Sequence, residues 1–249
     1  MRSIPLLAII GALATLPLTA AEQPAPGKQA EQQLKAGDVK TVDYLLYLPK
    51  EYAGDDSGKA WPLMLFLHGR GESDGPLSIV KKWGPPRLIE RGEHFPYIVV
   101  SPQCPRSPGS WPQPTQQAHL LQLLEHITKT YKVDKDRIYL TGLSMGGEAA
   151  YRFAAHRPET FAALAPLSCY VDSKTYSMLE RIKDLPVWVI HGADDTVFPL
   201  DKARQPVEAI RAAGGDVLFT ILEGHDHDTW TDTYSDPTFY EWLLEHLRP

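Results

Sequence analysis

Continuous apolar runs recur along the chain, and each ends at glycine, proline or polar residues. The clearest are Pro62–Leu67 (PLMLFL), which stops at a histidine, and Tyr97–Ser101 (YIVVS), which stops at a proline. Continuous rather than alternating apolarity is typical of strands buried on both faces, as in parallel sheets under helices. Further runs of this kind predict strands at 138–141, 161–167, 187–190 and 217–222.

Helical periodicity fills the segments between these runs. Residues 116–131 carry apolar side chains at helical spacing, and Thr115 in front of them is a candidate N-cap. Helices are also predicted at 148–156, 201–213 and 239–247. This alternation predicts an α/β fold, with a mostly parallel sheet and helices on both faces. In such open sheets the ligand binds beyond the carboxyl ends of the strands.

The first sixty residues have a different pattern. Residues 22–36 are rich in Pro, Gln and Ala without apolar periodicity, which predicts a flexible leader ahead of one domain at 37–249. Residues 39–48 are a predicted strand, and Asp55–Gly58 is a predicted turn. The strands on either side of that turn are expected to form a hairpin-like entry to the sheet.

Residues 1–21 have the pattern of a secretory signal peptide. Arg2 is followed by an apolar run of about 15 residues that Pro5 and Pro17 interrupt, and small residues at 19–21 suit cleavage. A spanning helix needs about 20 apolar residues, so no membrane anchor is expected after cleavage. The mature chain is therefore predicted to be secreted or periplasmic.

Composition narrows the range of partners. The 249 residues are 43% hydrophobic and 22% charged, with a formal charge of −6 and no basic run. This balance argues against nucleic acid as a partner. The oligomeric state is left open.

The strand at 138–141 leads into Gly142-Leu143-Ser144-Met145-Gly146, and a helix-forming run follows. A strand, Gly-x-Ser-x-Gly and a helix in immediate succession predict a nucleophile elbow, in which the serine sits on a strained turn with its hydroxyl exposed. The glycines are needed because a Cβ at either flank would collide with the neighbouring strand or helix. Chance alone places the bare motif in about one chain in fifteen. The flanking elements therefore favour a functional serine.

A serine nucleophile requires a base in hydrogen-bond reach and a carboxylate that orients the base. After an elbow, the acid and then the histidine follow later strands. Both positions are occupied: HGADDTVFP (191–199) follows one predicted strand, and GHDHDTW (224–230) follows the last.

With these motifs the chain resembles the α/β-hydrolase superfamily. Within it, the chain is similar to small secreted serine esterases related to dienelactone hydrolases and to predicted peptidases, from about Asp43 to Leu247. The resemblance implies the α/β-hydrolase fold. The segment between Arg70 and Pro96 is too short for a large lid.

The resemblance also implies which acid acts. In these relatives the acid is the third residue after His-Gly, with Val two positions and Pro four positions further on. This pattern assigns Asp195, which precedes Val197 and Pro199, and Asp194 is the alternative.

The catalytic histidine of similar proteins precedes Asp-x-Trp. His227 matches that pattern, and His225, next to Gly224, is the alternative. Alternating His225, Asp226, His227 and Asp228 could instead converge on a metal ion. Because the elbow already demands a histidine here, no metal site is predicted.

An oxyanion hole needs two N–H donors. One is the backbone of Met145, directly after the nucleophile, and the other comes from the loop after the third strand. The loop His68-Gly69-Arg70 resembles the His-Gly loop that supplies it, which assigns the Arg70 amide. His68 is expected to hold this loop by a hydrogen bond.

Together these residues predict an exported serine hydrolase that cleaves carboxylic esters, on small molecules or polymers, through an acyl-enzyme and without a cofactor. The alternatives are a serine peptidase, a polymer-directed esterase of feruloyl or polyhydroxyalkanoate type, and a non-catalytic binding protein on the same scaffold. Trp83, Gln103, Trp111 and Trp230 lie in loops expected at the same end of the sheet, and none is assigned a role.

Cys104 and Cys169 are predicted not to form a disulfide, although an oxidising compartment would permit one. Each follows a strand, and in the strand order that the resemblance implies, two other strands lie between. Three inter-strand spacings amount to roughly 14 Å, whereas a disulfide requires Cα atoms within about 7 Å.

Overall fold

The computed structural model describes residues 23–36, 40–53, 58–105, 110–111 and 113–249. The predicted signal peptide at 1–21 and most of the predicted turn at Asp55–Gly58 lie outside these ranges. Among the described helices, none combines the length and apolarity that crossing a membrane requires.

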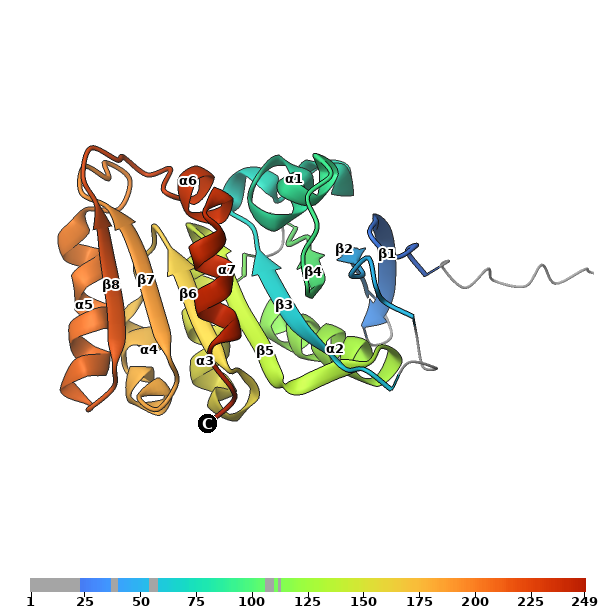
Figure 1. Cartoon of the computed structure of the whole chain (residues 1–249). Coiled ribbons are helices and arrows are strands. Elements are labelled where there is room, and N and C mark those ends of the chain that lie inside the picture. Colours follow the sequence, from blue (N-terminus) through green and yellow to red (C-terminus); the bar gives the residue numbers. More distant parts are fainter. Residues whose placement is uncertain (1–22, 37–39, 54–57, 106–109, 112) are drawn as a thin grey trace, which may run out of the picture.

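The described strands form one eight-stranded sheet in the order β1-β2-β4-β3-β5-β6-β7-β8 (Figure 1). The pairs β1–β2 and β2–β4 are antiparallel, and every later pair is parallel. The strands are β1 Gln29–Ala36, β2 Lys40–Tyr47, β3 Trp61–Leu67, β4 Ile98–Pro102, β5 Val133–Leu143, β6 Ala163–Leu167, β7 Val187–Gly192 and β8 Val217–Leu222. This is the predicted mostly parallel sheet.

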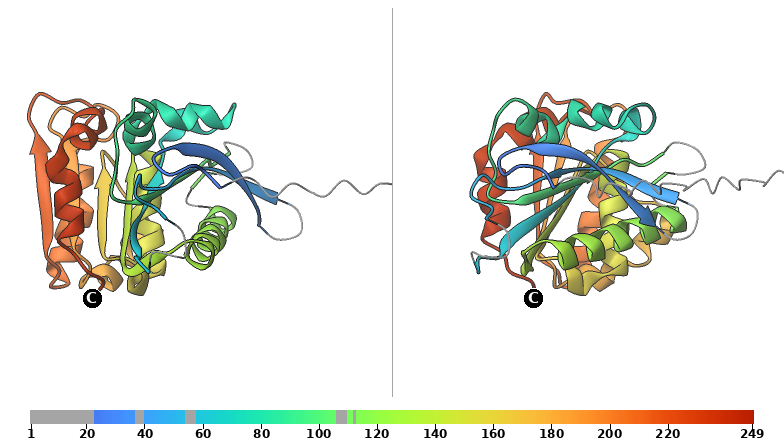
Figure 2. Two further views of the ribbon diagram at one scale, coloured as in Figure 1. Left: turned by 45° about the vertical axis from the view of Figure 1, so that its right-hand side comes forward. Right: turned by 90° about the vertical axis from the view of Figure 1, so that its right-hand side faces the viewer.

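Helices cover both faces of the sheet, as predicted (Figure 2). One hydrophobic cluster lies under α2, α3 and α5, and a second lies under α1, α6 and α7. The helices are α1 Gly84–Glu90, α2 Pro114–Thr130, α3 Met145–His156, α4 Ser173–Tyr176, α5 Leu200–Ala212, α6 Trp230–Ser235 and α7 Pro237–Leu244. Burial on both sides explains why β3 and β6 are apolar along their whole length, and β4 is apolar apart from Ser101.

The expectation that Thr115 caps α2 is wrong. The helix begins at Pro114, with Gln113 as N-cap and no side-chain capping bond. The fixed φ of proline suits the first helical position, where its missing N–H costs nothing, so the helix starts two residues earlier than predicted.

The expected hairpin around Asp55–Gly58 is also wrong. β2 pairs with β1 and β4, whereas β3 lies between β4 and β5. All seven residues of β3 are buried, so this strand is favoured in the centre of the sheet, away from its antiparallel edge.

The predicted flexible leader instead contains β1. Its eight residues pair antiparallel with β2, from Gln29 opposite Tyr47 to Ala36 opposite Lys40. Gln32 is buried and Leu34 packs against the core, while Glu31 and Gln33 face solvent. An edge strand with one polar face contains few apolar residues, which explains why the composition of residues 22–36 indicated a flexible leader.

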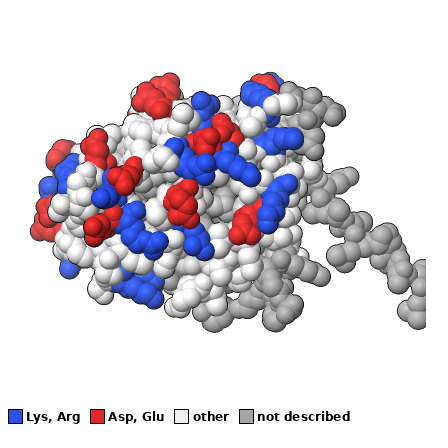
Figure 3. Space-filling view, turned by 90° about the horizontal axis from the view of Figure 1, so that it is seen from below, with Lys and Arg blue, Asp and Glu red and all other residues white. Residues whose placement is uncertain are grey.

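The strand order β4-β3-β5-β6 matches the order used to separate the two cysteines. Cys104 and Cys169 are both free and buried. In the view from below, on the side of the amino ends of the parallel strands, acidic and basic side chains are interspersed (Figure 3).

Candidate active site

The nucleophile elbow joins β5 to α3. Ser144 has φ 53° and ψ −120°, in a region that non-glycine residues rarely occupy, and it is the N-cap of α3. A Cβ on Gly146 would lie 2.0 Å from the Leu67 carbonyl oxygen, and one on Gly142 would lie 2.5 Å from the Gly146 carbonyl oxygen. The glycines therefore let the start of α3 pack directly against the end of β3, which keeps the strained serine in place.

The structure brings Ser144, His227 and Asp195 together at the carboxyl ends of β5, β7 and β8, the upper edge in Figure 1. His227 Nε2 lies 2.9 Å from Ser144 Oγ, and Nδ1 lies 2.8 Å from Asp195 Oδ2. A carboxylate only accepts, so Nδ1–H donates to Asp195 and Nε2 accepts from the serine hydroxyl. This tautomer is the one that can take the serine proton.

The Asp195 side chain is fully buried and held on both oxygens. Its Oδ1 accepts from the backbone N–H groups of Val197 and Phe198, at 2.9 and 2.8 Å. His191 Nε2 lies 3.4 Å from Oδ2 and 2.8 Å from the Phe198 carbonyl oxygen. Because both neighbours accept, this nitrogen carries a proton. Burial lowers the pKa of His191, which keeps the ring neutral beside the carboxylate.

The alternative residues lie elsewhere. Asp194 is exposed, and His225 Nε2 lies 2.9 Å from the Asp232 carboxylate. That contact raises the pKa of His225. Of the other two candidate metal ligands, Asp226 accepts a hydrogen bond from the Thr196 N–H and Asp228 accepts one from the Thr231 N–H. The four side chains diverge, and the described residues contain no group of three potential ligands that could hold a metal.

The two predicted oxyanion donors each occupy the first position of a helix. Met145 opens α3, and Arg70 opens the 3-10 helix Arg70–Glu72. N–H groups at such positions have no acceptor inside their helix, so both amides are available to an outside oxygen. The contact between Gly146 and Leu67 holds these two helix starts side by side.

His68 holds the Arg70 loop, as predicted. It is 1% exposed, its Nδ1 lies 2.6 Å from the Gly69 carbonyl oxygen, and its Nε2 accepts from the Cys104 N–H at 2.9 Å. Burial lowers the pKa of His68 to about 4, so the ring is neutral. Trp111, which had no assigned role, donates from its indole N–H to the His68 carbonyl oxygen.

Glu72 supports the same loop and was missed from the sequence. Its side chain is buried, and its carboxylate lies next to the Gly69 amide and the Trp83 side chain. Burial raises the pKa of Glu72 despite these donors. Gln103 donates to the Glu72 carbonyl oxygen at 3.0 Å. A lone glutamate after His-Gly carries no pattern that distinguishes it from a surface residue.

The histidine loop also has a support that the sequence did not reveal. Thr229 is fully buried, and its hydroxyl lies 2.6 Å from the hydroxyl of Ser168. Ser168 follows β6 with φ 46°, so a second strained serine lies beside the elbow. This bond ties the segment after His227 to the central sheet.

Aromatic rings flank the histidine on two sides. The Trp230 and Phe198 ring centroids lie 5.2 and 5.1 Å from that of His227, both edge-on. Trp83 stacks edge-on against Trp230, and Tyr170 against Phe198. Trp83, Tyr170 and Phe198 are partly exposed, so aromatic surface is available to a ligand next to the serine.

A family model described as "Putative esterase" matches residues 40–214, more than half of the chain. Among curated proteins, an endo-1,4-beta-xylanase/feruloyl esterase of Xylanibacter ruminicola is 30% identical over 211 residues, which cover 78% of this chain and 28% of that enzyme. Feruloyl esterase C of Emericella nidulans is 26% identical over 81% of this chain and 72% of its own length.

Among solved structures, a thermostable esterase superposes with a TM-score of 0.74 at 31% identity. The match covers 89% of this chain and 64% of that one. The architecture is therefore that of the α/β hydrolases. Because this chain spans about a quarter of the xylanase/feruloyl esterase, the match concerns one part of that enzyme.

Proposed function

The chain belongs to the esterase family whose model it matches, within the α/β-hydrolase superfamily, and on that premise we propose that it is a carboxylic-ester hydrolase with a Ser144–His227–Asp195 triad. The observation that carries the proposal is the pair of hydrogen bonds that His227 makes, to Ser144 Oγ and to Asp195 Oδ2.

In the proposed first step, Ser144 Oγ attacks the ester carbonyl while His227 Nε2 takes its proton. The carbonyl oxygen becomes an oxyanion, which the Met145 and Arg70 amides stabilise. His227 then donates the proton to the departing alkoxide, the C–O bond breaks, and an acyl-enzyme with the alcohol as product remains.

In the second step, water replaces the alcohol. His227 takes a proton from water as its oxygen attacks the acyl carbon, and returns it to Ser144 Oγ as the carboxylic acid leaves. Asp195 keeps the imidazole in the required tautomer and stabilises the imidazolium in both steps. Its four surrounding contacts keep it from rotating away.

The test is covalent labelling combined with kinetics. A fluorophosphonate probe should label Ser144, and Ser144→Ala should lower kcat/KM on p-nitrophenyl acetate by about 10⁴-fold or more, because the covalent route is lost. An unlabelled serine would favour the binding-protein alternative, and activity within tenfold of the wild type would refute the proposed nucleophile.

Esters rather than amides are the proposed substrates. An amine leaves only after protonation and requires a site that grips the peptide, so the p-nitrophenyl ester of a given acyl group should react at least about a hundredfold faster than the matching anilide. Comparable rates on a peptide series would instead support the peptidase alternative.

Aromatic acyl groups are the proposed substrate class, as in feruloyl esters. Supporting this are the partly exposed rings beside His227 and the feruloyl esterases among the relatives. A methyl ferulate series measured against methyl esters of aliphatic acids of equal size tests it. A preference for the aliphatic esters would refute this substrate class and leave the triad untouched.

Export is part of the same proposal. Residues 1–21 would be removed, which leaves 24 basic and 31 acidic residues and a formal charge of −7. The N-terminal sequence of the mature protein should begin near Glu22. Retention of Met1 on the protein outside the cytoplasm would contradict cleavage.

A further inference from the structure

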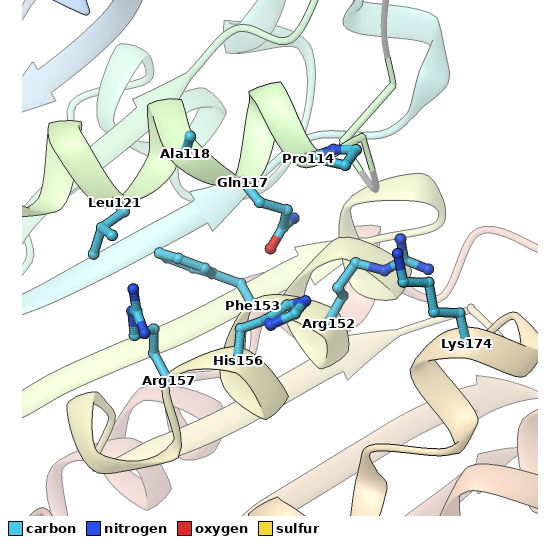
Figure 4. A pocket seen from close by; sticks show the side chains of 9 residues that line it. All are labelled: Pro114, Gln117, Ala118, Leu121, Arg152, Phe153, His156, Arg157 and Lys174. Carbon is cyan, nitrogen blue, oxygen red and sulfur yellow. The ribbon is translucent and has the colours of Figure 1, made fainter.

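A cavity of about 340 Å³ lies between α2 and α3, away from the triad (Figure 4). Arg152, in its wall, is eight residues along α3 from Ser144, which corresponds to about 12 Å of helix. Nothing in the proposed ester hydrolysis uses this cavity, although its volume is within the range of small-molecule sites, about 300–1,000 Å³.

The polar part of the wall is cationic. The nine lining residues include Arg152, Arg157, Lys174 and His156, and none of the nine is acidic. Figure 4 shows these side chains gathered along one side, from α3 and from the start of α4. Burial lowers the pKa of His156, and so do the surrounding cations, among them Arg152, Lys174 and Arg157. The cavity therefore has a positive potential.

Arg152 is fixed within this wall. Its side chain is 7% exposed, Nε donates to Thr175 Oγ1 at 2.9 Å, and a terminal nitrogen donates to the Asp172 carboxylate. Asp172 offsets one positive charge from outside the lining. The guanidinium of Arg157 and the ammonium of Lys174 are exposed at the rim, where an anion can reach them.

The remaining wall is largely apolar, with Phe153 from α3 and Leu121 from α2 facing each other across the cavity. Gln117 adds an acceptor. Its Nε2 donates to the Trp111 carbonyl oxygen at 2.9 Å, which fixes the amide, and its buried Oε1 has no donor among the described residues. In Figure 4 this oxygen points from α2 toward α3. A buried acceptor without a donor is unusual in a native structure and invites a ligand hydroxyl or amide.

We propose that this cavity is a second binding site, for a small organic carboxylate with an apolar body. The carboxylate would pair with Lys174 at one end of the cavity, and the apolar body would lie between Leu121 and Phe153, toward the end where Arg157 stands. Exposed ion pairs contribute little by themselves, so most of the binding free energy would come from burying the apolar body, while the cationic wall would select a carboxylate over a neutral head group.

The test is calorimetric titration of the full mature chain with 3-phenylpropionate. The neutral ketone 4-phenylbutan-2-one, which has the same size and no hydrogen-bond donor, is the matched probe. The carboxylate should bind at least tenfold more tightly than the ketone. Lys174→Glu should weaken binding at least tenfold, and Ala118→Trp, which fills the cavity from α2, should do the same. Lys202→Glu on α5 is the matched control and should leave binding unchanged, with circular dichroism confirming the fold of each variant.

Blocking the triad separates the two sites. Enzyme labelled by a fluorophosphonate should bind 3-phenylpropionate as tightly as the free enzyme. Binding lost after labelling would place the carboxylate in the hydrolytic site and overturn the proposal. Equal affinity for the ketone, no binding of the carboxylate at millimolar concentration, or unchanged affinity in both cavity variants would overturn it too. A failed hydrolase assay would not, because no part of this titration requires turnover.

Discussion

Two loops at the same end of the sheet each carry a histidine, and the two histidines are held in opposite ways. In the loop after β3, His68 is 1% exposed, and both of its ring nitrogens form hydrogen bonds with backbone groups, the Gly69 carbonyl and the Cys104 N–H. In the loop after β8, the His227 side chain is 18% exposed, and both of its ring nitrogens form hydrogen bonds with side chains, those of Asp195 and Ser144.

This difference separates a histidine that holds a loop from the one proposed to act as the base. Burial and a backbone donor on Nε2 leave His68 no means of exchanging a proton. His227 faces a hydroxyl, whose proton can move, and a carboxylate that stabilises the resulting charge. The comparison predicts that changes in the β8 loop alter chemistry, whereas changes in the β3 loop alter stability and oxyanion geometry.

The largest effect is expected at His227. His227→Ala should lower kcat/KM by about 10⁴-fold or more, because the serine loses its base. His225→Ala, measured on the same p-nitrophenyl ester, is the matched control and should stay within about threefold of the wild type, since His225 contacts only exposed groups. The reverse order would show that the wrong histidine has been assigned to the triad.

Asp195, in the loop after β7, is the acid proposed to orient His227, and it can be compared with its neighbour Asp194 in the same way. Asp195→Asn should lower kcat/KM by about 10³–10⁴-fold, because an amide can donate to the ring and favour the wrong tautomer. Asp194→Asn should have little effect, as that side chain is exposed. Near-equal losses for the two variants would refute the assignment of Asp195.

His68 should instead appear in the pH dependence of stability. Its pKa is lowered from 6.5 to about 4, chiefly by burial, so the unfolded chain binds a proton that the folded chain does not. The stabilisation is present above pH 6.5 and is lost as pH falls toward 4, by about 3 kcal/mol at most. Urea unfolding of wild type and His68→Asn at several pH values between 7 and 4.5 measures this. The unfolding free energy of the variant should depend less steeply on pH than that of the wild type. Equal slopes would contradict a buried neutral His68.

Glu72 gives the smallest of these effects and the sharpest test of the β3 loop. Glu72→Ala should lower kcat about 10- to 100-fold with little change in KM, since the loop that presents the Arg70 amide loses a support and one oxyanion donor is displaced. Glu72→Gln keeps an acceptor and should restore most of the rate. Glu125→Ala, on the exposed face of α2, controls for lost charge. A change confined to KM would mean that Glu72 shapes substrate binding instead.

The sequence was most informative where the backbone conformation requires a particular residue type. Gly142 and Gly146 mark a turn where a side chain would strike the backbone at the end of β3. The motif therefore singled out Ser144, and the motifs after β7 and β8 singled out Asp195 and His227. The structure brings these three side chains within hydrogen-bond distance. Strand order and the helices on both faces followed from apolar runs and from the resemblance.

Long-range polar contacts could not be predicted in this way. The Ser168–Thr229 bond joins residues 61 positions apart, and each is an ordinary hydroxyl in the sequence. β1 escaped notice because an edge strand buries only alternate residues, of which one is the polar Gln32. Glu72 was missed because only folding surrounds it with a backbone amide and an indole.

The two buried thiols have a practical consequence for experiments on this chain. Burial raises the pKa of Cys104 to about 12 and that of Cys169 well above its usual value, and the two side chains are 0% and 1% exposed. Maleimides react with the thiolate form of cysteine, so both native cysteines should be unreactive toward maleimides while the protein is folded. A single cysteine engineered on the surface would then be the only site to accept a fluorophore or spin label. The wild-type chain therefore serves directly as the background for labelling, with no need to remove either native cysteine.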